Sequence, residues 1–309
     1  MHERTLGTGG PALSVVGLGC NNFGMKLDGD TSIAVVHAAL DAGITHFDTA
    51  EMYGGGASET HLGTALGTRR SEVVIATKFS PRPADEPYEP GALASRITTA
   101  CESSLRRLGT DYIDLYYQHY PDPDAPLAEG FQALEALRTA GKVRAFASSN
   151  VSAEQIVAGG TEFVGTQIEW NLLQRAVEAE VVPAARQIGL GVIPYFPLAS
   201  GLLTGKYRLG EQFPAGSRLA AMPYFAAIAT TENLERVERL KAFAEDRGHT
   251  LLELAVAWLL AQDGVASVIC GATTPGQVTA NALAAGWVLT ASDLRDVEQQ
   301  LSPLGDGAR

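Results

Sequence analysis

The sequence is poor in the features that would direct a protein to a metal, a redox centre or a nucleic acid. Cysteine is rare, with Cys20, Cys101 and Cys270 the three in 309 residues. They lie far apart and share no spacing typical of a metal or redox site, which fits a reducing compartment. Positive charge is also scarce, because 35 acidic residues outnumber 23 basic ones and the net charge is −12. This charge has the wrong sign for a protein that follows a phosphate backbone, so we expect no nucleic-acid partner.

Long apolar runs are missing as well. The most apolar stretch, LLELAVAWLLA (251–261), is too short to span a bilayer and contains Glu253. The first residues, MHERTLGTGG, contain no apolar run, so no signal peptide is predicted. We therefore expect a cytoplasmic protein with no membrane partner.

The two common glycine-rich phosphate motifs are absent. GxxxxGK[ST] does not occur, which excludes a P-loop. The nearest match to G-x-G-x-x-G runs from Gly17 through Gly19 to Asn22, so it lacks the third glycine, and a polar loop follows it where a helix should begin. We interpret Gly17 and Gly19 as packing or turn glycines, which argues against a doubly wound dinucleotide-binding sheet.

What the chain does have is a regular alternation of short apolar runs and amphipathic stretches. Eight strands are predicted at 15–19, 45–49, 73–78, 112–118, 143–149, 164–170, 190–196 and 266–270. Helices are predicted near 31–42, 58–67, 91–107, 127–140, 152–158, 178–188, 232–262, 275–284 and 291–301. The stretch 232–262 is predicted to break at Gly248, with Thr250 capping its second half.

This alternation predicts one fold. Parallel strands need crossover connections, and eight strand–helix repeats match a (β/α)8 TIM barrel formed by residues 1–309 as a single domain. The residues before the first strand are predicted to form a short β-hairpin that caps the barrel floor. The stretch 197–230 after strand 7 is predicted to be a long structureless loop, and such loops are usually functional lids or disordered.

Four polar residues follow the ends of successive predicted strands: Asp48, Tyr53, Lys78 and His119. Catalytic groups of such barrels come from the C-terminal ends of different strands. A tyrosine with its ordinary pKa near 10 is a poor acid or base at neutral pH, but a neighbouring ammonium lowers that pKa. Taken singly, the tyrosine, the lysine and the histidine have structural interpretations; together they indicate proton transfer. A Schiff-base lysine at position 78, as in a barrel aldolase, is the competing chemistry.

Five segments make a family resemblance specific. DTAEMYGGGASE, IATK, DLYYQHYPD, WNLLQR and YFPLASGLLTGKY are similar to the aldo-keto reductases, and the similarity runs from GLGCNNFG to GATTPGQVTAN. It is closest to the branch of bacterial general reductases related to the potassium-channel β subunits. The resemblance implies a (β/α)8 barrel that reduces aldehydes or ketones with a bound nicotinamide. It implies that Tyr53 is the general acid, that Lys78, paired with Asp48, lowers the pKa of Tyr53, and that His119 orients the carbonyl.

The resemblance also implies a cofactor site. Its residues fall into groups for the carboxamide, the nicotinamide ring, the pyrophosphate and the adenosine end. The carboxamide positions are Ser149, Asn150 and Gln167, and the ring position is Tyr195. The pyrophosphate positions are Leu198, Ser200, Gly201 and Lys206, and the adenosine positions are Gly271, Thr273, Gln277 and Asn281. Arg218 matches a position near the 2′-phosphate. Amide side chains both donate and accept hydrogen bonds, which suits recognition of a carboxamide.

One departure from the family concerns the 2′-phosphate of NADP. Many relatives carry a Lys or Arg in the segment that here reads CGATTPGQ, and this chain has none between Val268 and Asn281. We therefore expect NADPH or NADP+ as cofactor, with NADH as a weaker second choice. The partner is expected to be a small carbonyl substrate. No metal site is expected, because no second histidine cluster accompanies His46. The alternative function is a non-catalytic, nicotinamide-binding regulatory subunit like the channel β proteins.

Overall fold

Eight parallel strands form a nearly closed barrel in this computed structural model, which describes residues 1–83, 85–122 and 124–302. The strands are β3 (Val16–Gly19), β4 (His46–Asp48), β5 (Val74–Phe79), β6 (Ile113–Gln118), β7 (Val143–Ser149), β8 (Gly165–Glu169), β9 (Gly191–Tyr195) and β10 (Val268–Gly271). They pair in the order β10-β3-β4-β5-β6-β7-β8-β9. The ends of this sheet meet at one bridge between Val192 and Val265. There Val192 N donates to Gly264 O at 2.8 Å and Ala266 N to Val192 O at 3.0 Å.

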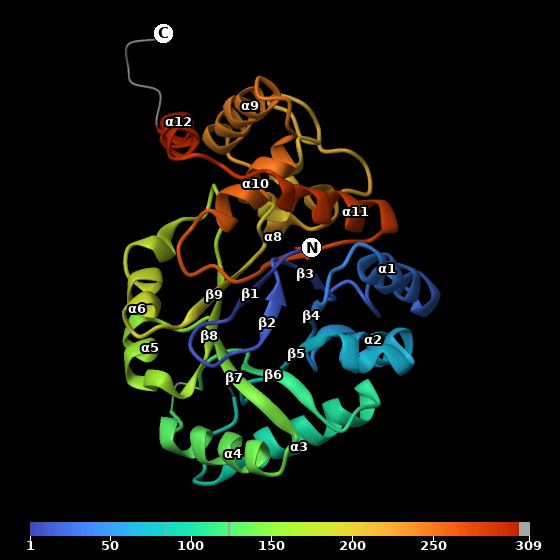
Figure 1. The fold of residues 1–309 in the computed structure, drawn as a ribbon, viewed down its shortest axis with the longest axis vertical. Helices are drawn as coiled ribbons and strands as arrows, with labels where there is room; N and C mark the ends of the chain where they lie inside the picture. The colour runs from blue at the N-terminus through green and yellow to red at the C-terminus, as the bar shows by residue number, and fades with distance from the viewer. Residues whose placement is uncertain (84, 123, 303–309) are drawn as a thin grey trace.

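Helices surround the barrel, and Figure 1 shows α1 to α6 arranged around the strands with α9 to α12 gathered at one side. The longer helices are α1 (Gly29–Asp41), α2 (Ala57–Leu66), α3 (Ala92–Leu108), α4 (Leu127–Thr139), α5 (Ala153–Gly159), α6 (Val181–Gln187), α9 (Thr231–Glu245), α10 (Leu251–Leu260), α11 (Pro275–Leu283) and α12 (Ala291–Leu301). The 3₁₀ segments are η1 (Tyr53–Gly56), η2 (Gly67–Glu72), η3 (Gly160–Glu162), η4 (Ala176–Glu178), η5 (Ala199–Thr204) and η6 (Ala284–Gly286). The predicted (β/α)8 barrel is confirmed.

A β-hairpin closes the end of the barrel at which the strands begin. Strands β1 (Glu3–Thr5) and β2 (Ala12–Ser14) pair antiparallel, as predicted. Leu6, between them, is 0% exposed and packs with the inward side chains of the barrel. A Cβ added at Gly165 or Gly191, the first residues of β8 and β9, would lie only 2.8 or 2.5 Å from Leu6 Cδ1. Glycine at these two positions therefore admits the leucine into the barrel floor.

The break predicted inside 232–262 is also confirmed. Gly248 adopts a left-handed φ of 76° between α9 and α10. The Thr250 side chain accepts a hydrogen bond from Glu253 N, and the Glu253 carboxylate accepts one from Thr250 N, which makes a capping box. These contacts fix the start of α10, all but two of whose ten residues are buried.

The segment 197–230 is not structureless, so this prediction was wrong. It contains η5 and two short helices, α7 (Arg218–Ala221) and α8 (Pro223–Ala226). The Ser217 side chain caps α7 and a proline begins α8. Each helix is four residues long, too short to show a helical period in the sequence.

Candidate active site

The period of two along a strand brings polar side chains from six strands to one end of the barrel interior. On β6, Leu115 and Tyr117 face the inner core, and the next residue on that face is His119. On β5, Ala76 faces the same core and Lys78 follows it. On β7 and β9, Ser149 and Tyr195 follow the inward residues Ala147 and Ile193 in the same way. Asp48 and Gln167 lie towards the C-terminal ends of β4 and β8.

Lys78 and Asp48 form a buried ion pair. Lys78 Nζ donates to Asp48 Oδ1 at 2.6 Å and to Thr49 O at 2.8 Å, and none of the Lys78 side chain is exposed. Asp48 Oδ2 accepts from Gln167 Nε2 at 2.8 Å, so both carboxylate oxygens have donors. Burial acts to lower the pKa of Lys78, but the negative charge and hydrogen bond of Asp48, with a contribution from Tyr53, outweigh it and the pKa lies above its ordinary value. Lys78 is therefore a fixed ammonium.

Tyr53 lies over this ion pair at the start of η1. The centre of its ring is 5.2 Å from Lys78 Nζ. Gly54 follows with a φ of 58°, and a Cβ there would lie 2.9 Å from Phe23 O, so the turn that presents Tyr53 requires glycine.

Lys78 and Asp48 were predicted to lower the pKa of Tyr53 below its ordinary value. This prediction was wrong, because the net pKa of Tyr53 lies above that value. Burial of the phenol raises the pKa of Tyr53, and the positive charge of Lys78 opposes the rise without cancelling it. Asp48 adds to the rise, because its negative charge disfavours a phenolate. Tyr53 therefore carries its proton at neutral pH and is a hydrogen-bond donor, with an ammonium beside it.

His119 completes the group. Its ring lies 5.9 Å from the Tyr53 ring between centroids, edge to face, and 4.8 Å from the ring of Tyr120, nearly parallel. Burial, with a further contribution from the charge of Lys78, lowers the pKa of His119 to about 3. The imidazole is therefore neutral at physiological pH and can donate one hydrogen bond from the nitrogen that carries its proton.

The group lies at one end of a cavity of about 880 Å³. Asp48, Tyr53 and His119 line this cavity, and Lys78 lies behind them. Every residue predicted for the cofactor lines it too: Ser149, Asn150, Gln167, Tyr195, Leu198, Ser200, Gly201, Lys206, Arg218, Gly271, Thr273, Gln277 and Asn281. The structure thus brings together side chains from positions 48 to 281 of the chain.

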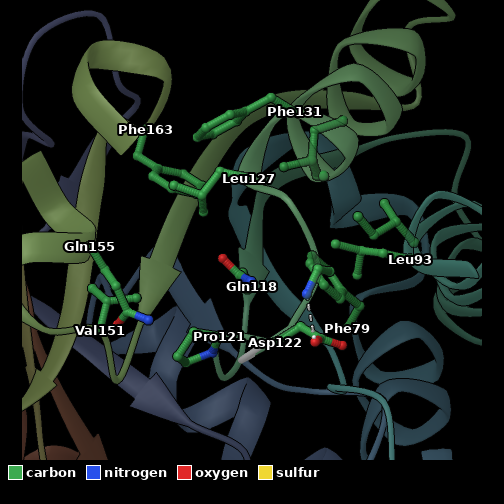
Figure 2. A pocket seen from close by; sticks show the side chains of 14 residues that line it. Phe79, Leu93, Gln118, Pro121, Asp122, Leu127, Phe131, Val151, Gln155 and Phe163 are labelled. Carbon is green, nitrogen blue, oxygen red and sulfur yellow. Dashed lines mark hydrogen bonds between the residues drawn. The ribbon is translucent and has the colours of Figure 1, made fainter. Parts of the chain in front are cut away.

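A second, smaller cavity of about 40 Å³ lies on the other side of the sheet, towards the helices. Figure 2 shows it between Phe79, Leu93, Phe131 and Phe163, with the Gln118 side chain among them. Gln118 precedes His119 and points to the opposite face of β6, as the period of two requires. The volume of this cavity is far below the few hundred Å³ of a typical ligand site, so it is not the candidate active site.

The amide side chains near Tyr53 are already organised. Tyr195 Oη donates to Asn150 Oδ1 at 2.8 Å, and Asn150 Nδ2 donates to His119 O and Ser149 Oγ at 3.0 Å each. Gln167 is tied to Asp48, as described above, which leaves its carbonyl oxygen to accept. This network links the predicted carboxamide-binding residues directly to the proton-transfer group.

The loop after β9 bends back on itself at the other side of the cavity. Ala199, Ser200 and Gly201 all have left-handed φ values, of 46°, 57° and 100°. Left-handed backbone at non-glycine residues costs about 1–3 kcal/mol each and is concentrated at functional sites. A Cβ at Gly201 would lie 3.0 Å from Lys206 Nζ, so the ammonium lies directly over this bend.

Three cations share this part of the cavity: Lys206, Arg218 and Lys26. Burial lowers the pKa of Lys26, and the positive charges of Arg218 and Lys206 lower it further. No ion pair joins any of the three to a carboxylate within the described ranges 1–83, 85–122 and 124–302. Three cations without carboxylate partners form a suitable site for an anion such as a phosphate.

The remaining predicted residues lie around the start of α11. Thr273 N and Oγ1 donate to Gln277 Oε1 at 2.8 and 3.1 Å, and Asn281 Nδ2 donates to Gly271 O at 3.3 Å. Ala280 also lines the cavity here. Lys26, from the loop after β3, lines the same cavity.

Lys26, Met52, Tyr120 and Glu169 are among the cavity residues that the sequence analysis missed. Glu169 could have been found, because it lies two residues after Gln167 on the same face of β8. Tyr120 and Met52 are next to His119 and Tyr53 in the chain. Lys26 had no such signal, because it belongs to an irregular loop.

No group of three or more His, Cys, Asp or Glu side chains that could hold a metal ion is found among the described residues. Nor does that part of the chain contain a helix long and apolar enough to cross a membrane.

Comparisons with known proteins agree with this geometry. The model of the aldo/keto reductase family matches residues 15–301. The chain is 36% identical to aldo-keto reductase YhdN of Bacillus subtilis, over 96% of this chain and 92% of the relative. It is 35% identical to probable aldo-keto reductase 1 of Glycine max, over 98% and 89% respectively. It is also 37% identical to a probable voltage-gated potassium channel subunit beta of Oryza sativa subsp. japonica, over 91% and 90%.

Proposed function

The chain belongs to the aldo/keto reductase family, which supports oxidoreductase activity, and we propose that it reduces aldehydes or ketones to alcohols with NADP(H). The observation that carries the proposal is the buried Lys78–Asp48 ion pair beneath a protonated Tyr53, with a neutral His119 beside it. We further propose that residues 1–309 act as one domain, and that the protein works in the cytoplasm.

The residues of the large cavity fit a nicotinamide dinucleotide. Amides and a hydroxyl lie next to Tyr53, three cations without carboxylate partners in the described chain lie farther along, and hydrogen-bonding side chains surround the start of α11. Ser149, Asn150 and Gln167 would hold the carboxamide, Tyr195 the ring, and Lys206 the phosphates. When bound, the nicotinamide supplies the hydride that reduces the carbonyl carbon.

The proton-transfer residues then act on the carbonyl oxygen. Tyr53 donates its proton to this oxygen as the carbon is reduced, so the product is an alcohol and Tyr53 is left as a phenolate. The Lys78 ammonium stabilises that phenolate, and the attraction is strong because the site is buried. Asp48 holds Lys78 in place, and neutral His119 donates a hydrogen bond that orients the carbonyl. Tyr53 regains a proton from solvent after the product leaves.

For the cofactor we propose NADP(H) with modest discrimination against NAD(H). Arg218 and Lys26 supply positive charge, and Thr273 and Gln277 supply hydrogen bonds, but no basic side chain lies between Val268 and Asn281. The ratio of kcat/KM for NADPH and NADH tests this proposal. A clear preference for NADH would contradict it.

Two other functions are less well supported. A Schiff base at Lys78 needs a neutral amine, whereas Asp48 holds Lys78 as an ammonium at 2.6 Å. A non-catalytic regulatory role is suggested by the relatives described as channel β subunits. The protonated Tyr53 and neutral His119 favour catalysis over that role, and the experiment below separates the two.

The test uses purified protein, NADPH and a panel of aldehydes, with the loss of NADPH absorbance as readout. Tyr53→Phe should lower kcat by about 10²–10⁴-fold, the range expected for a general acid. Tyr88→Phe is the matched control, because Tyr88 bonds Glu129 outside the large cavity, and it should keep full activity. A fully active Tyr53→Phe would exclude Tyr53 as the acid, and an inactive unsubstituted protein that still binds NADPH would favour the regulatory role.

A further inference from the structure

The carboxylate of Glu59 is buried outside the large cavity, where α2, α3 and β5 meet. Glu59 lies in the first turn of α2 and is 0% exposed. Its Oε1 accepts from Thr77 Oγ1 at 2.6 Å, and its Oε2 accepts from Arg107 Nε, also at 2.6 Å, in an ion pair. Thr77 belongs to β5 and Arg107 to the end of α3, so one carboxylate joins three elements. None of the three residues lines the large cavity, so the mechanism proposed above does not use them.

Both partners of this carboxylate are neighbours of the proposed proton-transfer residues. Thr77 directly precedes Lys78 on β5, so the two side chains point to opposite faces of the strand. Arg107 packs against Gly56, the last residue of the 3₁₀ segment η1 that begins with Tyr53. A Cβ added at Gly56 would lie 2.7 Å from Arg107 Cδ and 2.9 Å from Arg107 Nε, so this contact requires glycine. The ion pair therefore contacts the turn of Tyr53 directly and the strand of Lys78 through a hydroxyl.

The start of α2 has a second attachment that does not involve the ion pair. Ser58 Oγ donates to Cys20 O at 2.8 Å, so it accepts from Thr49 Oγ1, also at 2.8 Å. The carbonyl oxygen of Thr49 in turn accepts from Lys78 Nζ. Because these bonds remain when Arg107 is changed, we expect such a change to affect the turn of Tyr53 more than the position of α2.

A need for stability alone does not explain a buried ion pair. Replacing such a pair with apolar side chains of similar volume is often neutral or stabilising, because both charges lose their hydration on burial. What the pair supplies here is a fixed direction. The guanidinium of Arg107 is planar and rigid, and its Nη2 donates to Ser104 Oγ at 3.3 Å while its Nε donates to Glu59. Two acceptors thus fix the orientation of the group that packs against Gly56.

We propose that Glu59 and Arg107 are positioning residues for the reaction, which set the distance between Tyr53 and Lys78. This inference rests on the proposed function. The centre of the Tyr53 ring lies 5.2 Å from Lys78 Nζ, and the two residues are on separate segments, a turn and a strand. The attraction between a phenolate and an ammonium weakens as their distance grows. A contact that reaches both segments therefore acts on proton transfer without meeting the substrate.

The test compares the native protein with Arg107→Ala. Its kcat with NADPH and an aldehyde should fall about 10- to 100-fold, as expected when a reacting group is misplaced by about 1 Å. Titration of protein fluorescence with NADPH gives the number of binding sites and the Kd. The Kd should stay unchanged, because no residue of the proposed cofactor site is altered, and kcat is expressed per NADPH-binding site so that unfolded protein does not count.

Arg106→Ala is the matched control. Arg106 is the preceding residue on α3, is exposed and donates to Ser103 Oγ, so its loss should leave kcat unchanged. An unchanged kcat in Arg107→Ala would overturn the inference while leaving the proposed function intact. Equal losses of kcat and of NADPH affinity would also overturn it, because they indicate general damage to the fold. No turnover by the native protein would instead remove the function on which the inference rests.

A second variant separates positioning from stability. Arg107→Ala leaves a buried carboxylate without its cation, so the free energy of unfolding should fall. Adding Glu59→Gln removes that buried charge and should restore much of the lost stability, measured by urea denaturation. The contact with Gly56 stays absent in this double variant, so kcat per site should remain low. A kcat that recovers together with the stability would show that the pair only stabilises the fold, and would contradict the proposal.

Discussion

Lys78 keeps its charge although none of its side chain reaches solvent, and Asp48 is the reason. The family resemblance implied this pair, and the parallel pairing of β4 with β5 brings the two strand ends together. The direction of the Tyr53 pKa was not predictable, because burial of the phenol depends on side chains from the whole barrel end. A family motif can identify the partner of a residue, whereas the depth of burial is a property of the folded chain.

His46 makes the protein sensitive to acid. Ser267 Oγ donates to Ser14 O, so its oxygen accepts from His46 Nδ1 at 2.9 Å, and buried His46 Nε2 has no partner among the described residues. Burial lowers the pKa of His46 to about 4. As the pH falls below about 6.5, His46 binds a proton in the unfolded chain but not in the folded protein. The free energy of unfolding therefore decreases down to about pH 4. The unfolding free energy attributable to His46 should fall by about 2–3 kcal/mol between about pH 7 and pH 4.5.

Urea denaturation of the native protein and of His46→Gln measures this effect. Other groups titrate in the same range, so the informative quantity is the difference between the two proteins. His46→Gln should lose less stability on acidification, by the amount given above. Equal losses in both proteins would exclude His46 as the acid-sensitive group.

Lys26 should contribute to cofactor binding although it stands outside every motif of the sequence. Its ammonium lies with Lys206 and Arg218 in the part of the cavity that we propose for the phosphates. Lys26→Ala should weaken NADPH binding about tenfold, or 1.4 kcal/mol, as for loss of one charge-assisted contact. Titration of protein fluorescence with NADPH gives the Kd without any turnover.

The matched control for this change is Lys142→Ala. Lys142 pairs with Glu102 at 2.8 Å outside the cavity, so its loss should leave the Kd unchanged. The effect of Lys26→Ala should also shrink at high salt, because an exposed charge is screened. An equal Kd for native protein and Lys26→Ala at low salt would show that the lysine does not meet the cofactor.

At the scale of elements, the eight strands were predictable because each carries a short apolar run between turn-forming residues. Six of the eight predicted ranges contain the observed strands, and the ranges 73–78 and 266–270 end one residue early, since β5 extends to Phe79 and β10 to Gly271. The helix predicted near 178–188 is shorter, with α6 beginning at Val181 after the turn of η4. The elements of 197–230 escaped prediction, because left-handed Ala199 and Ser200 follow from the bend of the loop and not from residue type.

The start of α10 depends on Thr250. Its side chain accepts from Glu253 N at 3.2 Å in the capping box described above. Thr250→Ala should lower the unfolding free energy by about 1 kcal/mol, the usual effect of removing an N-cap. Chemical denaturation measures it, and Thr64→Ala, an exposed threonine inside α2, is the control with little expected change. Equal stability of Thr250→Ala and the native protein would mean that packing alone positions α10.

At the scale of the whole molecule, the hairpin and the barrel should unfold together. Leu6 fills the barrel floor against Gly165 and Gly191 with no exposed surface. Leu6→Ala should therefore destabilise the fold by about 2–5 kcal/mol, as for other buried leucines. Leu209→Ala, at a side chain 44% exposed, should change stability by less than about 0.5 kcal/mol. A small loss for Leu6→Ala would show that the hairpin is separable from the barrel.

The convergence of the proposed site residues could be predicted from the sequence, and every residue proposed for the cofactor lines one cavity with Tyr53. It follows from family motifs at strand ends that meet by the topology of a barrel. Lys26 lies outside the motifs and could not be placed, because an irregular loop brings it to the cavity.

The bridge between Val192 and Val265 has one more consequence. At this bridge two backbone hydrogen bonds join the first and last parts of the sheet, whereas the other neighbouring strands pair over several residues. The loop carrying Lys206 follows β9 and the segment with Thr273 follows β10, so the two segments proposed to bind the cofactor's phosphates and adenosine lie on opposite sides of this bridge. Amide protons at this bridge should exchange faster than those of β5 and β6. A ligand that contacts the segments on both sides would hold them together and lower the exchange rate at the bridge.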